Sequence, residues 1–203
     1  MATSNSTSIY TTLTDVTLVK AEWFRRYELH QKPDSFDRIV QSWDSASKVS
    51  ELADYSACTT WGIKGKHVYL LHVFRKQLEY PDLKRSVRQQ KQLFSANVVL
   101  IEDQASGTQL IQELNREGLG GLTRYKPDGD KIMRMHAQTA IIEDGRVLVP
   151  AEAPWLDDFL REVSVFPKGK YDDQVDSTTQ ALQYLRDRSS KLAVWWRLAR
   201  NAQ

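Results

Sequence analysis

Short apolar segments of strand length recur through the first half of the chain. The segment RIVQSW at 38–43 is rich in β-branched and aromatic residues, is too short for a helix and ends at Asp44. Two longer apolar segments, 55–63 and 67–75, are separated by Lys-Gly-Lys, and a glycine at that separation is a hairpin signal. The pattern predicts three consecutive antiparallel strands, with a carboxylate at the end of the first.

Beyond residue 80 the pattern switches between helical and strand periods. Pro81 begins a predicted helix with Leu83 and Val87 on its buried side, and the run NVVLI at 97–101 predicts a strand buried on both faces. The remaining predicted elements are a helix through 114, a strand at 122–125, a helix over 130–143 with a core of Ile132, Met135, Ala140 and Ile141, an extended piece at 146–150, and helices over 154–166, 172–188 and the tail. Strands and helices that alternate in this way predict an α/β domain.

Length and composition indicate an ordinary globular protein. The chain has 203 residues, 41% hydrophobic and 27% charged, which favours one domain over 35–190 with a lead-in at 1–34 and a helical tail at 191–203. No apolar run is long enough for a membrane span and the N-terminus lacks a signal pattern, so a cytosolic protein is expected. Cys58 lies in an apolar strand and is expected in the core.

Charge alone does not point to nucleic acid, because the formal net charge is only +2. Basic residues do recur in local groups: Lys84, Arg85, Arg88 and Lys91; Lys126, Lys131 and Arg134; Lys168 and Lys170. A solvated surface explains each group unless the fold brings it near an acidic site.

Acidic residues form the more specific pattern. Asp44 and Glu102 each end an apolar strand, and Asp172, Asp173 and Asp176 cluster in the first turn of a predicted helix. Capping and the helix dipole account for one or two first-turn carboxylates, but three within five residues exceed that need. On a helix, 173 and 176 share a face, as do 172 and 176.

These acids predict a site for divalent metal if the fold brings them together. Oxygen-only ligands suit Mg²⁺ or Mn²⁺, and two such ions would activate water and steady the leaving oxygen of a phosphodiester. Asp103 is an alternative to Glu102 as the ligand. The histidines show no ligand spacing, and His67 and His72 lie in strands, so zinc is disfavoured. No GxSxG motif is present, which argues against a serine hydrolase.

Seven segments together resemble one known family. They are QSWDSA at 41–46, ADYSACTTWGI at 53–63, LEYPDLKRSV at 78–87, IEDQASGTQLIQEL at 101–114, GDKIMRMHAQ at 129–138, GRVLVP at 145–150 and FPKGKYDDQVDSTTQAL at 166–182. In this order they resemble the C-terminal nuclease domain of the large terminase subunit of tailed bacteriophages, over roughly residues 35–187. The resemblance implies an RNase H-like α/β fold, with a central mixed sheet whose first three strands are antiparallel, flanked by helices.

The resemblance also implies roles for particular residues. Asp44, Glu102 and Asp173 would be the catalytic acids and, with Asp176, the ligands of Mg²⁺ or Mn²⁺. Asp103, Asp172 and Asp176 would be auxiliary, and Lys131, Arg134, Lys168 and Lys170 would contact DNA phosphate. The family pattern often has His-Asp-Asp where this chain has Tyr171, Asp172 and Asp173, so the metal-binding aspartate stays open.

The function implied is a Mg²⁺- or Mn²⁺-dependent endonuclease that cuts concatemeric viral DNA during genome packaging in the host cytoplasm. The implied partners are double-stranded DNA, the terminase ATPase domain, the small terminase subunit and the portal of the procapsid, with no membrane. No GxxxxGK[ST] phosphate loop occurs, and GIKGKH at 62–67 lacks its spacing, so the motor is not expected in this chain. A junction resolvase or integrase of the same fold, and a non-catalytic DNA-binding assembly module, remain alternatives.

Overall fold

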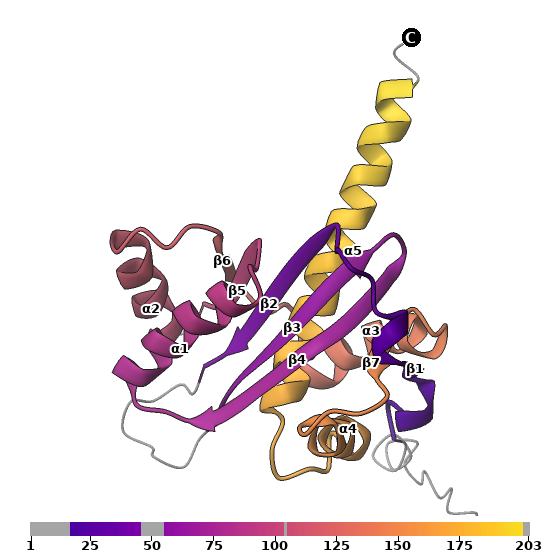
Figure 1. Ribbon diagram of the computed structural model, residues 1–203, viewed down its shortest axis with the longest axis horizontal. Helices are drawn as coiled ribbons and strands as arrows, with labels where there is room; N and C mark the ends of the chain where they lie inside the picture. Colours follow the sequence, from indigo (N-terminus) through magenta and orange to yellow (C-terminus); the bar gives the residue numbers. More distant parts are fainter. Residues whose placement is uncertain (1–16, 46–54, 104, 201–203) are drawn as a thin grey trace, which may run out of the picture.

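The computed structural model describes residues 17–45, 55–103 and 105–200 of the chain. Residues 1–16 of the predicted lead-in and residues 46–54 lie outside these ranges. The elements are η2 (Ala21–Trp23), β1 (Arg25–Tyr27), η3 (Leu29–Gln31), β2 (Arg38–Asp44), β3 (Tyr55–Lys64), β4 (His67–Gln77), α1 (Tyr80–Leu93), β5 (Val98–Glu102), α2 (Ala105–Arg116), β6 (Leu122–Tyr125), α3 (Lys131–Glu143), β7 (Val147–Pro150), α4 (Leu156–Val165) and α5 (Asp173–Arg200) (Figure 1). None of the helices in these ranges is long and apolar enough to cross a membrane.

One mixed sheet of seven strands organises the domain, in the order β1-β7-β4-β3-β2-β5-β6. The three antiparallel strands predicted from the sequence are β2, β3 and β4, and their hairpin turns at Gly65, which has a φ of 57°. The strands β5, β6, β7 and β1 join this centre through parallel pairs. The predicted α/β fold with a central mixed sheet is therefore confirmed.

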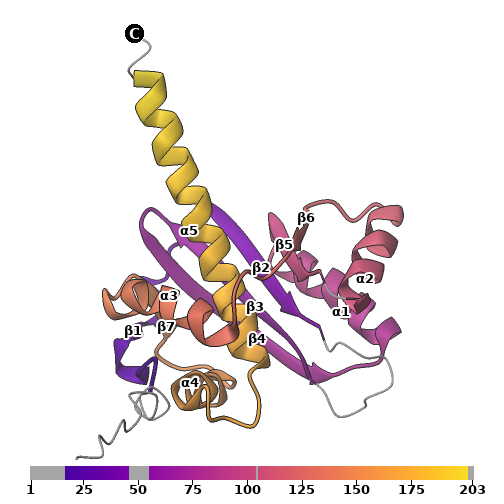
Figure 2. The same cartoon turned by 180° about the vertical axis from the view of Figure 1, so that it is seen from behind.

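Helices cover both faces of the sheet, because successive strand residues point to opposite sides. On one face, Trp43 and Cys58 pack with apolar residues of α1 and α2. On the other, Trp61 and Val73 pack with α3, α4 and α5. Figure 2 shows α5 lying across this second face, with its C-terminal part projecting beyond the strands. Cys58 is fully buried, as predicted.

The sequence did not predict the first strand. β1 lies before residue 35, where the sequence placed the start of the domain, and it pairs in parallel with β7. Three residues are too few to show strand periodicity, so the pairing with β7 decides the conformation. Tyr27 anchors this edge, because its buried hydroxyl donates to the Leu70 carbonyl oxygen at 2.9 Å.

The predicted core of α3 was partly wrong. Met135 is fully buried and Ile141 half-buried, but Ile132 is 47% exposed and Ala140 is also exposed. The helix instead buries a face that includes Arg134, Gln138 and Ile142, which pack toward α5. Two of these residues are polar, so hydrophobicity alone predicted a different face. The tail is also not a separate helix: α5 continues to Arg200, since no glycine or proline interrupts 173–200.

Candidate metal centre

Asp44 and Glu102 end neighbouring strands. β2 and β5 are parallel, with Trp43 paired to Ile101, so the next residue of each strand lies at the same edge of the sheet. Trp43 and Ile101 pack toward α1 and α2, and the alternation of the strands therefore turns Asp44 and Glu102 to the face that α5 covers. Glu102 is buried and Asp44 half-buried.

Asp103, the alternative to Glu102, serves the start of α2. Its Oδ1 accepts a hydrogen bond from the Thr108 hydroxyl at 2.7 Å, and the Arg124 guanidinium lies 3.8 Å from the same oxygen. The start of α2 packs closely against the end of β5, because a Cβ at Gly107 would overlap the Glu102 carbonyl oxygen. This geometry favours Glu102 over Asp103 as the acid that faces α5.

The first turns of α5 carry the third acidic position, and two buried groups fix where this helix lies. The Glu162 carboxylate accepts from the Gln174 backbone N–H and from its side-chain amide, both at 2.6 Å, and so caps the helix from α4. Ser177 bonds β2 and β3: its hydroxyl donates to the Ser42 carbonyl oxygen at 2.7 Å and accepts from the Thr59 N–H at 3.0 Å. Both contacts hold Asp173 and Asp176 against the strand that ends at Asp44.

The charges of these acids act on one another. The pKa of Asp44 is raised well above its ordinary value by burial first, and then by the negative charges of Asp176, Glu102 and Asp173. Burial also raises the pKa of Asp173, against the opposing effect of Arg75. Glu102 of β5 and Asp173 and Asp176 of α5 thus lie near enough to Asp44 for their charges to act on it. A cation between them would relieve their repulsion, so this donor set fits a divalent metal.

As they lie here, no three metal-ligating side chains among the described residues are close enough together to hold one ion. Protein cations occupy several of the carboxylate oxygens instead. Arg75 of β4 donates from Nη2 to Asp173 Oδ2 at 3.1 Å, and its guanidinium lies over the rings of Tyr55, at 3.8 Å, and Tyr171, at 4.7 Å. Sequence reasoning missed this role, because Arg75 looks like the polar end of a strand and lies 98 residues from its partner.

Lys131 and Arg134, predicted as phosphate contacts, also bind these acids. Lys131 Nζ lies 2.6 Å from Asp176 Oδ2 and 2.7 Å from Asp172 Oδ2, and Arg134 Nη2 lies 2.7 Å from Asp176 Oδ1. Although burial lowers it, the hydrogen bonds to Asp172 and Asp176 raise the pKa of Lys131 overall. Asp176 is therefore buried with both oxygens paired to cations.

The other basic residues divide into two groups. Lys168 and Lys170 are exposed on the turn before α5, where the Lys170 ammonium lies 4.9 Å from the centre of the Tyr171 ring. The basic side of α1 instead faces acids of α2, since Lys84 bridges Glu113 at 2.9 Å and Glu117 at 3.0 Å. Lys84 therefore forms ion pairs within the protein that join α1 to α2.

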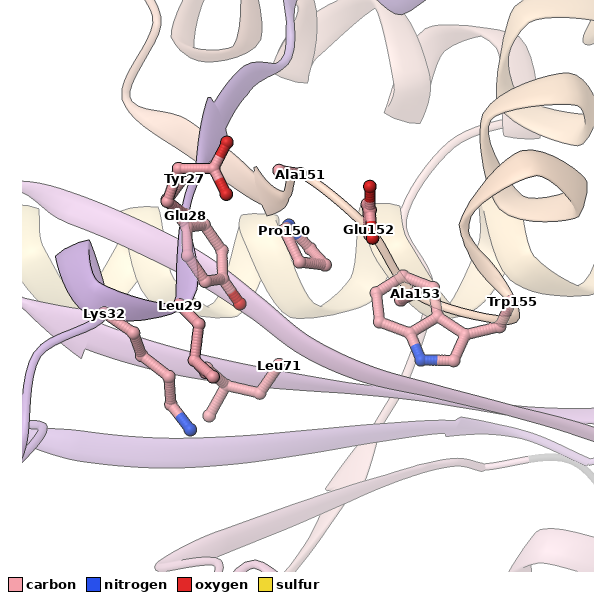
Figure 3. Close-up of a pocket in the computed structure, with 10 residues that line it drawn as sticks. All are labelled: Tyr27, Glu28, Leu29, Lys32, Leu71, Pro150, Ala151, Glu152, Ala153 and Trp155. Atoms are coloured by element: carbon pink, nitrogen blue, oxygen red, sulfur yellow. The ribbon is translucent and has the colours of Figure 1, made fainter.

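The acidic cluster is separate from the pocket in Figure 3. That pocket, of about 390 Å³, lies beside β1, η3 and the segment after β7, and none of the predicted site residues lines it. The residues that line it include Tyr27, Leu71 and Trp155, together with the acidic residues Glu28 and Glu152. The acidic residues that the sequence singled out therefore lie outside this pocket.

A known protein family has a model that covers the parts of the strands and of the helix that carry these acids. The family model described as the terminase RNaseH-like domain matches residues 41–185, a range that contains Asp44, Glu102 and all three acids at the start of α5. The chain belongs to the terminase RNaseH-like domain family. No curated protein matches its sequence.

Solved terminase structures share the fold of this terminase domain. A large terminase from a thermophilic bacteriophage matches with a TM-score of 0.62 at 13% identity, over 83% of this chain and 44% of that chain. The large terminase nuclease of thermophilic phage G20c matches with a TM-score of 0.61 at 13% identity, over 82% of this chain and 97% of that one. Its form with bound magnesium has a TM-score of 0.58 at 15% identity, over 80% and 94%. The chain thus spans less than half of the first of these terminases and nearly all of the G20c nuclease.

Proposed function

We propose that this terminase domain is a divalent-metal-dependent DNA endonuclease that cuts concatemeric viral DNA during genome packaging. The observation that carries the proposal is the position of Asp44 near Glu102, Asp173 and Asp176: burial first, and then the negative charges of these acids, raise the pKa of Asp44. Supporting it are the family, and the magnesium, zinc and cobalt bound in structures of the G20c nuclease. Carboxylate oxygens of this kind are the ligands that Mg²⁺ and Mn²⁺ prefer.

The roles of the residues follow from their positions. Asp44 and Glu102 would hold metal from the sheet, and Asp173 and Asp176 from α5. Two bound cations would supply an activated water and charge stabilisation at the leaving oxygen of the phosphodiester. Arg75 would orient Asp173, since it fixes one of its oxygens.

DNA contacts come from the exposed basic residues of the same edge. Lys168 and Lys170 precede α5 on the surface and would bind phosphate, which positions the duplex without reading sequence. Arg134 is buried against Asp176, so its part in DNA binding would be indirect. We therefore expect cutting with little sequence preference.

The wider setting is also part of the proposal. Because the chain spans 44% of the larger bacteriophage terminase that it matches, we infer that an ATPase motor acts with this domain, together with the small terminase subunit and the portal of the procapsid, in the host cytoplasm. Double-stranded DNA is the substrate, and no membrane is involved.

Plasmid cleavage in Mn²⁺ tests the proposal. The wild-type chain is expected to nick and linearise supercoiled plasmid, whereas Asp44→Asn and Glu102→Gln lose the activity because each removes a ligand charge. Asp103→Asn is expected to retain most of it, since Asp103 serves α2. Intact plasmid at high enzyme, or full activity of Asp44→Asn, would reject the nuclease. Preference for a four-way junction over linear duplex would point to a resolvase instead.

A further inference from the structure

Lys131 and Arg134 hold the same carboxylate in different ways. Arg134 is 9% exposed and also donates to the Gly129 carbonyl oxygen at 3.1 Å, so two contacts fix its guanidinium against Asp176 Oδ1. Lys131 is the first residue of α3, and its side chain is 48% exposed. Its ammonium pairs with Asp176 Oδ2 and Asp172 Oδ2. Of these two side chains, only that of Lys131 is both flexible and exposed enough for its ammonium to move into solvent.

Lys131 pairs with the acid that acts most strongly on Asp44. Asp176 contributes the largest of the charge effects that raise the pKa of Asp44, and Lys131 is the cation that opposes them. A divalent cation bound to Asp44 and Asp176 would meet the Lys131 ammonium at Asp176 Oδ2, and two cations repel when they share one oxygen. The metal ion and the ammonium therefore cannot both stay bound to Asp176 Oδ2.

We propose that Lys131 is a displaceable counter-ion of the metal centre. With no metal bound, its ammonium neutralises Asp176 and Asp172 and keeps α3 joined to α5. Metal binding displaces it from Asp176 Oδ2, so Lys131 lowers the affinity of the site for divalent cations. This inference rests on the proposed function, because it takes Asp176 as a metal ligand. It also reconciles the contact seen here with a phosphate role, since a released ammonium stays tethered beside the site.

Metal titration of the folded chain without DNA tests the inference. Lys131→Met keeps the aliphatic stem and removes the charge, and we expect it to bind Mn²⁺ roughly three- to tenfold more tightly than wild type in isothermal titration calorimetry. Lys131→Gln, which keeps a polar end, should shift in the same direction. If Lys131 only held Asp176 in place, both variants would bind Mn²⁺ more weakly.

Lys84→Met is the matched control. Lys84 also bridges two carboxylates at 2.9 and 3.0 Å, but between α1 and α2. Its loss should leave Mn²⁺ affinity unchanged. Unchanged or weaker binding by both Lys131 variants, with wild type binding Mn²⁺ and cutting plasmid, would overturn the role of Lys131 and leave the nuclease standing. Wild type that neither binds Mn²⁺ nor cuts would overturn both.

Discussion

Of the two buried groups that position α5, the Ser177 hydroxyl is the one that binds the sheet. Ser177 follows Asp176 and is fully buried, and its Oγ lies 2.7 Å from the Thr59 hydroxyl in addition to its bonds with the Thr59 N–H and the Ser42 carbonyl. The Trp61 indole donates to the same Thr59 hydroxyl at 2.8 Å, which extends the network across β3. Ser42 lies two residues before Asp44. The Ser177 hydroxyl therefore links the turn of α5 that carries Asp176 to the strand that ends at Asp44.

Ser177→Ala would leave this network without its centre. The Thr59 N–H and the Ser42 carbonyl would lose their contact with Ser177 while staying buried, and a buried polar group without a partner costs about 1–3 kcal/mol. We therefore expect the free energy of unfolding to fall by about 2–4 kcal/mol. In a domain of this size, that corresponds to a lower melting temperature by roughly 5–15 °C.

The neighbouring residue supplies the control. Thr178 is also fully buried, but its hydroxyl has no hydrogen-bond partner among the described residues. Thr178→Val keeps the shape and removes an unsatisfied polar atom, so it should leave stability unchanged or raise it. Urea denaturation of the three proteins measures both effects, through the midpoint at constant slope. Equal stability of Ser177→Ala and wild type would refute the reasoning that this hydroxyl fixes α5.

Further predictions concern the charges. Asp44→Asn should raise the melting temperature in EDTA, because it removes a carboxylate whose neighbours repel it, and should abolish the stabilisation that Mn²⁺ gives the wild type. Since the pKa values of Asp44 and Asp173 are raised on folding, their charges oppose folding. In EDTA, their contribution to stability should be fully present below the ordinary aspartate pKa of about 4 and be lost as pH rises through the raised values. Urea denaturation should show a smaller pH dependence over this range in Asp44→Asn. Arg75→Met should lower the Mn²⁺-dependent cleavage rate about 10–100-fold, because Asp173 loses the hydrogen bond that fixes one of its oxygens. Arg88→Met is the control: it loses only a surface ion pair with Glu117 and should cleave as wild type.

The positions of the two strand-borne acids were predicted well from the sequence, for a local reason. An apolar segment that ends in an acid places that acid at a strand end, and the alternation of side chains selects the face. Asp44 and Glu102 follow this rule, so their convergence needed only the parallel pairing of β2 and β5. The start of α5 was also predicted correctly, because its acids come directly after a turn.

Contacts between distant segments could not be predicted in this way. Arg75, Glu162 and Ser177 each act on a partner from another element, and their residue types are common in strands and helices with no such role. The short β1 strand depends likewise on β7, which comes more than a hundred residues later. The buried face of α3 was mistaken because Arg134 is buried through its pair with Asp176, a partner that periodicity does not reveal.

Anomalous diffraction from crystals soaked in Mn²⁺ would test the central claim most directly. The account predicts manganese density bounded by Asp44, Glu102 and the two acids of α5, with Lys131 moved away from Asp176. Manganese bound elsewhere, or no density at the edge where these side chains meet, would contradict it.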